Sequence, residues 1–566
     1  MADGMLHIGP NKARCMPDDN PIVGYALDSR HFAKAGPSGK VSPRRCARFT
    51  TRRFPPCLEP VARPDPLRMI LRLRSTVLPS LLLATLSTLP GADYYVDAAK
   101  GDDTAPGTSP RHAWRSLEKA NSQPLLPGDR LLFKAGERWT GQLKPRGTES
   151  AKRGGDTALR VIGCYGEGPA PRIDGEGKHR DTLWIENLSF IEVRDLEITN
   201  HGPARAPFRC GVRISAENIG PAKKIRLRNL HVHDVNGDLR KSHEGCGIFF
   251  ETKGKPDTYF DDLIIENCRV ERSDRNGICQ RSHGTARSRG VVIRGNRLDD
   301  IGGDGIKLWG SDGGIIEHNI VRHARARCED HAAGIWPFAC DDTLIQFNEV
   351  SGTRGTKDGQ GYDADYYCRR TLFQYNLSHR NEGGFMLFCA PAKAWSEDTV
   401  VRYNLSIEDG LNSARVFHFG GAATRTLVHN NTIVIGPHQD LPLLRFSEWN
   451  GGKPSDTRFI NNLFLVLEGG RATYDFSPSR GHTFEENLFL GNHVGLPPGI
   501  KAIPSGTLLP GPFEPREDRG WLDGLRPRSK DHFPRGKRLP NPGRRDFFGH
   551  PLPAGPPAIG AAEPAP

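Results

Sequence analysis

The chain has 566 residues, among them 64 glycines, 45 prolines and only 5 methionines, and its formal net charge is +12. Glycine and proline together make up about a fifth of the chain, which favours a turn-rich β protein and argues against a helical bundle. Collagen is excluded because glycine does not recur at every third position. Half of the net positive charge lies in residues 1–68. A positive charge that is concentrated at one end of the chain is weak evidence for nucleic-acid binding, so we expect no nucleic-acid partner.

The N-terminal part of the chain has the pattern of a processing region. Residues 69–92 begin with methionine, carry two arginines, continue as an apolar run of about a dozen residues and end in small residues. This pattern is typical of a secretory signal peptide, and the apolar run is too short to span a membrane. We therefore expect a secreted or periplasmic protein without a stable membrane anchor. Residues 1–68 are then either an over-extended start that the native protein lacks or a disordered basic leader.

Two markers recur through the middle of the chain at intervals of about 28 residues. Asparagine stands just before an apolar residue, and glycine starts a short run rich in aliphatic side chains, without helical periodicity. Self-similarity at a fixed period indicates a solenoid, and short strands indicate a parallel β-helix in which inward asparagines stack on one another. The asparagines are Asn187, Asn229, Asn267, Asn296, Asn319, Asn348, Asn376, Asn404, Asn431, Asn462 and Asn487, and the glycines are Gly211, Gly247, Gly277, Gly305, Gly334, Gly361 and Gly384.

Through these markers the chain resembles the right-handed parallel β-helix proteins of the pectate-lyase-like superfamily. The resemblance implies an all-β solenoid over residues 155–494 in a secreted protein that acts on polysaccharides. Residues 93–154 are expected to form the entry and N-terminal cap, with a short amphipathic helix over residues 112–120. Residues 495–566 are rich in proline and glycine and predict an irregular tail along the outside. Because both ends are covered, we expect a monomer.

Alternation along each strand predicts the side chains that face outward. If the residue after each glycine points inward, the next residue and the one two beyond it point outward. Trp309, Trp336 and Phe338 then lie on adjacent turns, where exposed rings suit sugar substrates unless a loop covers them as a satellite core. The first outward column otherwise holds Arg213, Phe249, Cys279, Lys307, Asp363, Met386 and Phe417, and the second holds Ser215, Glu251, Arg281, Asp365, Phe388 and Phe419.

The same face carries a pair of acidic residues. Asp363 and Asp365 have α-carbons about 6.5–7 Å apart in strand geometry. Two such carboxylates cannot both ionise freely, and a raised-pKa acid beside an ionised partner is what glycosidic cleavage requires. A solvated or arginine-paired couple is the alternative, although aspartate is disfavoured in mid-strand. Glu382, at the start of the next strand, is a substitute for either acid, while Arg281 and His331 are expected to line the groove.

Three functions fit this face. A glycoside hydrolase acting on a polysaccharide, which we favour, would use Asp363 and Asp365 as the acid and the base or nucleophile. A polysaccharide lyase would use Lys307 as the base and a Ca²⁺ ion held by Asp358 and the aspartate pair to neutralise a uronate. A non-catalytic glycan-binding solenoid would use the aromatic rings alone. Hydrolysis yields reducing ends, elimination yields an ultraviolet-absorbing product, and binding yields neither.

Overall fold

The computed structural model describes residues 91–147, 158–243, 245–412, 414–498, 500, 502–503, 519–527 and 533–564. The predicted leader, and all but the last two residues of the predicted signal peptide, lie outside these ranges. Strands dominate the described part, from β1 (Asp93–Val96) to β45 (His493–Val494), and α1 (Leu117–Ser122) is its α-helix. No helix in these ranges is long and apolar enough to cross a membrane.

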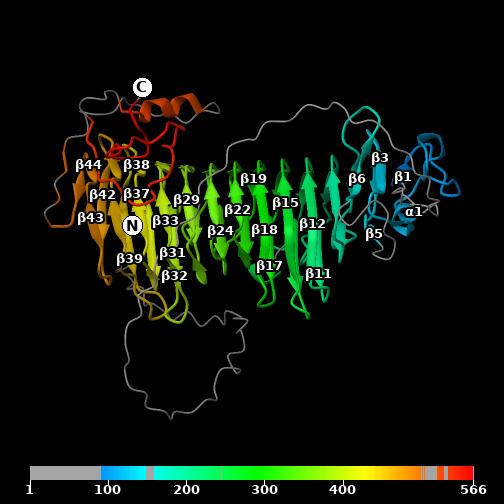
Figure 1. Cartoon of the computed structure of the whole chain (residues 1–566), viewed down its shortest axis with the longest axis horizontal. Coiled ribbons are helices and arrows are strands. Elements are labelled where there is room, and N and C mark those ends of the chain that lie inside the picture. The colour runs from blue at the N-terminus through cyan, green and yellow to red at the C-terminus, as the bar shows by residue number, and fades with distance from the viewer. Residues whose placement is uncertain are drawn as a thin grey trace, which may run out of the picture. The chain divides into compact units, whose positions relative to one another are not determined.

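The strands stack into three long parallel sheets, as Figure 1 shows. A 15-stranded sheet runs from β1 to β43 (Thr483–Glu485), and a 13-stranded sheet runs from β4 (Arg138–Thr140) to β44 (Leu488–Leu490). Each strand pairs with its equivalent in the next turn, so the fold is a parallel β-helix, as the repeat and the family resemblance predict. The stack begins before the expected start at residue 155, because β1 pairs with β3 (Arg130–Lys134) inside the expected cap region.

The third sheet has 12 strands, and its outer face carries the side chains that the sequence singles out. Inward aliphatic residues repeat in register from turn to turn, and their burial stabilises the stack at about 25 cal/mol per Å² of apolar surface. In chain order the strands are β8 (Asp181–Glu186), β11 (Cys210–Glu217), β14 (Cys246–Lys253), β17 (Asn276–Ser282), β20 (Ile306–Trp309), β24 (Ile335–Phe338), β27 (Gln360–Ala364), β31 (Gly384–Ala390), β35 (Phe417–Gly421), β39 (Asp440–Ser447), β42 (Arg471–Asp475) and β45.

A ladder of inward asparagines runs along the second half of the solenoid. Asn376, for example, donates from its side-chain amide to Asn404 Oδ1 at 3.0 Å and to the backbone oxygen of Ile345 at 2.9 Å. Its own Oδ1 accepts from the backbone and side-chain amides of Asn348. Each buried amide is thus satisfied by its neighbours, as buried polar groups require. The members are Asn296, Asn319, Asn348, Asn376, Asn404, Asn431, Asn462 and Asn487.

The ladder prediction is wrong for the first three asparagines. Asn187, Asn229 and Asn267 are exposed and have left-handed φ angles of 52°, 53° and 55°. The ladder position in the turn of Asn267 falls one residue later, where the backbone amide of Cys268 donates to Asn296 Oδ1 at 2.9 Å. Asparagine tolerates the left-handed turn and also forms ladders, so one residue type marks two adjacent positions.

The N-terminal helix is shorter and begins later than the predicted 112–120. The side chain of Ser116 accepts from the backbone amide of Lys119 at 3.1 Å and thereby caps α1. Trp114 and Leu117, the expected apolar face, are both buried, at 2% and 7% exposure. The cap therefore buries the predicted side chains with less helix than expected.

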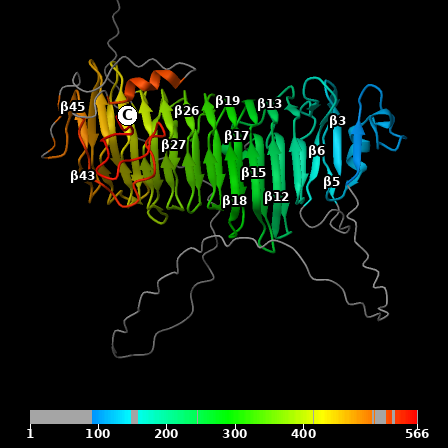
Figure 2. The same ribbon diagram turned by 45° about the horizontal axis from the view of Figure 1, so that its top comes forward.

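The described part of the C-terminal tail packs against the 13-stranded sheet. Figures 1 and 2 show this segment, in orange and red, beside the last turns of the solenoid. It contains η4, a 3₁₀ helix (Arg519–Leu525), whose Leu522 shares an apolar cluster with Leu405 and Leu463. The tail also accepts a hydrogen bond from Asn430 at 3.0 Å. It thus covers apolar side chains on the outside of the solenoid.

Candidate active site

The candidate site lies on the outer face of the 12-stranded sheet around β20, β24 and β27. Ile306 pairs with Ile335, which pairs with Tyr362, and all three side chains are buried. Because strand residues alternate, the residues that follow them face outward. The predicted register agrees with the structure here, for Lys307, Trp336 and Asp363 in the first column and Trp309 and Phe338 in the second.

Beyond β27 the predicted register is wrong by one residue. Counting from Gly384 places Met386 outward, whereas the structure pairs Met386 with the inward Tyr362. Gly384 has a φ of 120°, and a Cβ there would lie 2.2 Å from a backbone oxygen of the next turn. An extra residue therefore enters the strand where only glycine fits. The side chains wrongly predicted to face outward, all 0% exposed, are Met386, Phe388, Phe417 and Phe419.

The extra residue brings an unforeseen side chain to the site. Asp363 pairs with Leu387, so two residues further along Asp365 lies beside Cys389 of β31. Cys389 Sγ donates to Asp365 Oδ1 at 3.1 Å. The sequence gives no signal for this contact, because Cys389 ends an apolar run that looks like core.

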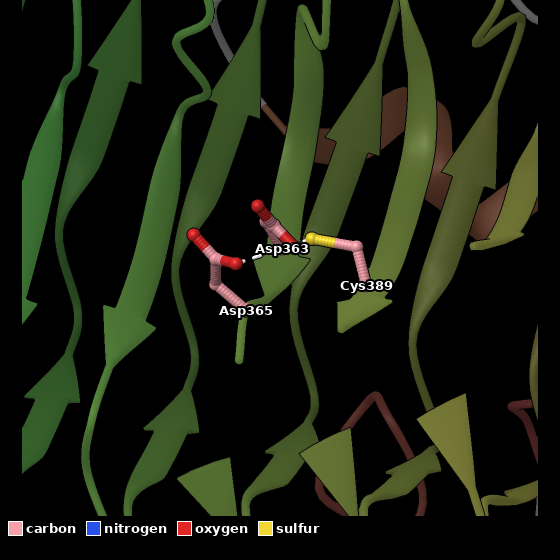
Figure 3. Close-up of side chains that lie close together, drawn as sticks. All are labelled: Asp363, Asp365 and Cys389. Atoms are coloured by element: carbon pink, nitrogen blue, oxygen red, sulfur yellow. Dashed lines mark hydrogen bonds between the residues drawn. The ribbon is translucent and has the colours of Figure 1, made fainter. Parts of the chain in front are cut away.

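Asp363, Asp365 and Cys389 form a compact group, which Figure 3 shows. One oxygen of each carboxyl group and the cysteine sulfur lie within 4.8 Å of one another. Asp365 is 8% exposed and also accepts from the backbone amide of Tyr366 at 2.7 Å. Asp363 is 4% exposed, and its Oδ1 has no hydrogen-bond partner within the described residues.

Burial and mutual repulsion raise the pKa values of these carboxyl groups. Burial raises the pKa of Asp363 well above its usual value, and the charges of Asp365 and Asp358 raise it further. Burial also raises the pKa of Asp365, to about 7, although the Cys389 thiol and the Lys241 ammonium act in the opposite direction. The raised-pKa acid predicted from the sequence is therefore present.

Asp358 is a third member of this electrostatic group. It precedes β27 in a loop, is partly buried and has a left-handed φ of 61°. Burial raises the pKa of Asp358 above its usual value, although the charges of His331, Lys241 and Arg415 act in the opposite direction. Three cations therefore oppose the effect of burial on Asp358.

A chain of half-buried aromatic rings lies beside the carboxyl groups. The ring of Trp309 meets that of Phe338 at 4.8 Å between centroids, and Phe338 meets Tyr366 at the same distance. Tyr367 and Trp395 extend the chain with a contact at 4.9 Å. Tyr366 follows Asp365 directly, so the rings begin next to the acid. Such rings can contact the apolar faces of sugars.

Trp336 faces outward as predicted, but it is covered and not exposed. It is 5% exposed, and its Nε1 donates to Asp304 Oδ1 at 2.9 Å. The ammonium groups of Lys241 and Lys307 lie 5.4 and 5.6 Å from its ring centre. Lys241 comes from η2 (Lys241–His243), ahead of β14, so a loop covers this ring as the alternative interpretation allowed. Lys307, the predicted lyase base, is 1% exposed.

The other predicted residues lie at the margins of the group. The guanidinium of Arg281 is 5.4 Å from the Trp309 ring centre, at one end of the aromatic chain. His331 is exposed and acts on Asp358 through its charge. The carboxylate of Glu382 accepts from the backbone amide of Gly355, and no contact within the described residues joins it to the aspartate pair.

The three predicted calcium ligands, Asp358, Asp363 and Asp365, are not the three residues whose ligand atoms converge in the structure. Calcium takes about six to eight oxygen ligands, whereas the atoms that converge here are two carboxyl oxygens and a sulfur. Asp358 is absent from this group of convergent atoms. The residues therefore fit a Ca²⁺ ion poorly.

Comparisons with known proteins agree with this fold. A family model described as "Right handed beta helix region" matches residues 210–361 and 246–464. A lacto-N-biosidase of Bifidobacterium longum subsp. longum is 26% identical over 559 residues, which cover 78% of this chain and 34% of that protein. The chain thus spans about a third of the length of this curated relative.

Solved structures of a similar protein extend the comparison. A native GH136 lacto-N-biosidase from Eubacterium ramulus is 24% identical with a TM-score of 0.55, covering 67% of this chain and 68% of that chain. Its selenomethionine derivative is 25% identical with a TM-score of 0.56, covering 68% of each chain. These similarities establish the shared β-helix.

Proposed function

We propose that this chain is a glycoside hydrolase that cleaves glycosidic bonds in a glycan. The observation that carries the proposal is a group of buried carboxyl groups with raised pKa values beside half-buried aromatic rings. Glycosidic cleavage needs one protonated and one ionised carboxyl group at the scissile bond. The similarity to lacto-N-biosidases supports the same class of reaction.

The surroundings of each carboxyl group indicate which one is protonated and which one is ionised. Asp365 has a pKa of about 7 and suits the general acid. We assign the ionised nucleophile or base to Asp358, because three cations oppose the rise in its pKa that burial causes. Burial, and then the charges of Asp365 and Asp358, favour the neutral form of Asp363, and we assign Asp363 the role of setting the protonation of these two neighbours. This assignment modifies the sequence-based one, which gave both roles to Asp363 and Asp365.

The names of the relatives suggest the first substrates. We propose a lacto-N-bioside or a related oligosaccharide, to be tested as a nitrophenyl glycoside and as an intact oligosaccharide. Half-buried rings from Trp309 to Trp395 offer surfaces for several sugar units. The chain spans only part of the curated relative, so the assay also includes a broader panel of glycans.

The experiment compares Asp358→Asn and Asp365→Asn on these two substrates. A general acid matters most when the leaving group is poor, and such catalysis is worth about 10²–10⁴-fold. Asp365→Asn should therefore lose most activity on the intact oligosaccharide and much less on the nitrophenyl glycoside. Asp358→Asn should lose activity on both. The control is Asp342→Asn, a carboxylate outside the group that pairs with Arg370 at 2.6 Å.

Specific outcomes would overturn this proposal. Wild-type protein that releases no reducing ends from any glycan would refute hydrolysis. An unsaturated, ultraviolet-absorbing product would instead favour the lyase alternative, which the burial of Lys307 and the sulfur beside the acids argue against. If Glu382→Gln lost as much activity as Asp358→Asn, Glu382 would replace Asp358 as the candidate for the ionised carboxylate.

Export and oligomeric state are further proposals. We propose that residues 69–92 direct secretion, which N-terminal sequencing of the native protein would test by locating the mature start near residue 93. We also propose a monomer, to be tested by sedimentation of the mature chain.

A further inference from the structure

The group of Asp363, Asp365 and Cys389 has a second chemical property besides acidity. Asp363 and Asp365 come from β27 and the residue just after its end, and Cys389 comes from the neighbouring β31. Their three ligand atoms lie within 4.8 Å of one another. A tetrahedral zinc site with bonds of about 2.0–2.3 Å places ligand atoms roughly 3.5 Å apart. Small side-chain rotations therefore suffice to bring these atoms to one ion.

An independent observation is that one buried carboxyl oxygen of this group has no partner in the part of the chain that the structure describes. The side chain of Asp363 is almost entirely buried, yet its Oδ1 has no hydrogen-bond partner within the described residues. Lys241 acts on the group through its field, but no ion pair joins it to Asp363. A buried carboxyl group without a partner is costly, and a cation bound between the two strands would supply one.

The sulfur atom decides which cation fits. Thiolate is a soft ligand that selects zinc-like ions, whereas calcium and magnesium prefer oxygen. We propose that Asp363, Asp365 and Cys389 bind a thiophilic divalent cation of the Zn²⁺ and Cd²⁺ class, with water completing the coordination. Binding displaces the thiol proton and any proton on the two carboxyl groups, and these protons pass to solvent. Occupancy would inhibit the enzyme, and this consequence rests on the proposed function.

Binding is tested on the full chain with Cd²⁺ as the probe. Titration of the wild type should develop a sulfur-to-cadmium charge-transfer band, and the difference from Cys389→Ser should isolate the site from other thiols. The matched control is Cys164→Ser, which removes another partly buried thiol, on β6 (Arg160–Tyr165) of the 15-stranded sheet. Asp363→Asn keeps the thiol and should weaken Cd²⁺ binding by at least about tenfold, the loss typical of even an outer-shell partner.

The outcomes separate this proposal from the proposed function. A band that is unchanged in Cys389→Ser, or an excess of Ca²⁺ that displaces Cd²⁺, would overturn the metal site. Folding of each variant is checked by circular dichroism, and Asp363→Asn remains informative if Cys389→Ser fails to fold. Inhibition is measured as the ratio of rates with and without Zn²⁺, which should approach one in Cys389→Ser. Cadmium binding without glycosidase activity would refute the function alone, and activity without cadmium binding would refute the metal site alone.

Discussion

Replacing one asparagine of the ladder should destabilise the solenoid far more than replacing an exposed one. In Asn376→Ala, the backbone and side-chain amides of Asn348 lose the oxygen that accepts them at 3.0 Å each. The backbone oxygen of Ile345 loses its donor at 2.9 Å, and Asn404 Oδ1 loses one of its two. Asn376 is 1% exposed, so bulk solvent does not replace the lost partners.

The magnitude follows from counting the orphaned groups. Three groups lose a partner: the backbone and side-chain amides of Asn348 and the backbone oxygen of Ile345. At about 1–3 kcal/mol each, Asn376→Ala is expected to cost about 3–9 kcal/mol. The matched control is Asn229→Ala, at an exposed turn with a φ of 53° and one side-chain bond to Asp195 at 2.9 Å. The free energy of unfolding of Asn229→Ala should fall by about 1 kcal/mol, mainly because alanine tolerates the left-handed backbone conformation less well than asparagine.

Two measurements check this difference. Chemical unfolding followed by far-ultraviolet circular dichroism compares the midpoints of both variants with the wild type. Hydrogen exchange then tests the local consequence, because the Asn348 amide should exchange faster in Asn376→Ala and unchanged in Asn229→Ala. Equal midpoints for the two variants, together with a protected Asn348 amide, would refute the reasoning that ladder bonds hold adjacent turns together.

Three further predictions concern the candidate site and its sheet. Cys389→Ala should raise the pKa of Asp365, because the ionised form of Asp365 loses a hydrogen bond worth about 1 kcal/mol. The alkaline limb of the kcat/KM profile should then move upward by about half to one pH unit. A limb that does not move would contradict the assignment of Asp365 as the acid. Trp309→Ala should raise KM about tenfold with a smaller change in kcat, measured by initial rates, whereas a fall in kcat alone would contradict a binding role. Burial raises the pKa of Glu251, but its cationic neighbours outweigh this effect and bring the pKa to about 2, against a usual 4.5. The ionised Glu251 should therefore stabilise the fold at neutral pH, and this contribution should be lost as pH falls from about 4.5 to about 2. The Tm of Glu251→Gln should fall less steeply than that of the wild type over this range, and an identical slope would contradict the prediction.

The repeat could be predicted from the sequence because each turn must place similar residues at equivalent positions. Glycine before an aliphatic residue marks a strand start in turn after turn, so the inward position of Ile306 and the outward position of Trp309 follow from counting. The same counting fails at Gly384, where a backbone contact with the next turn admits an extra residue. It also fails at Asn229, because an exposed turn favours the same residue type as the ladder.

By itself, the sequence determined the parallel β-helix, the outward position of Asp363 and the presence of aromatic residues nearby. Local alternation and a fixed period carry that information, since neighbouring turns differ only by one repeat. Only the tertiary structure decided that Cys389 lies against Asp365, that a loop carrying Lys241 covers Trp336, and that burial raises the pKa of Asp365 to about 7. These features depend on burial and on contacts between residues far apart in the chain, which no local pattern encodes.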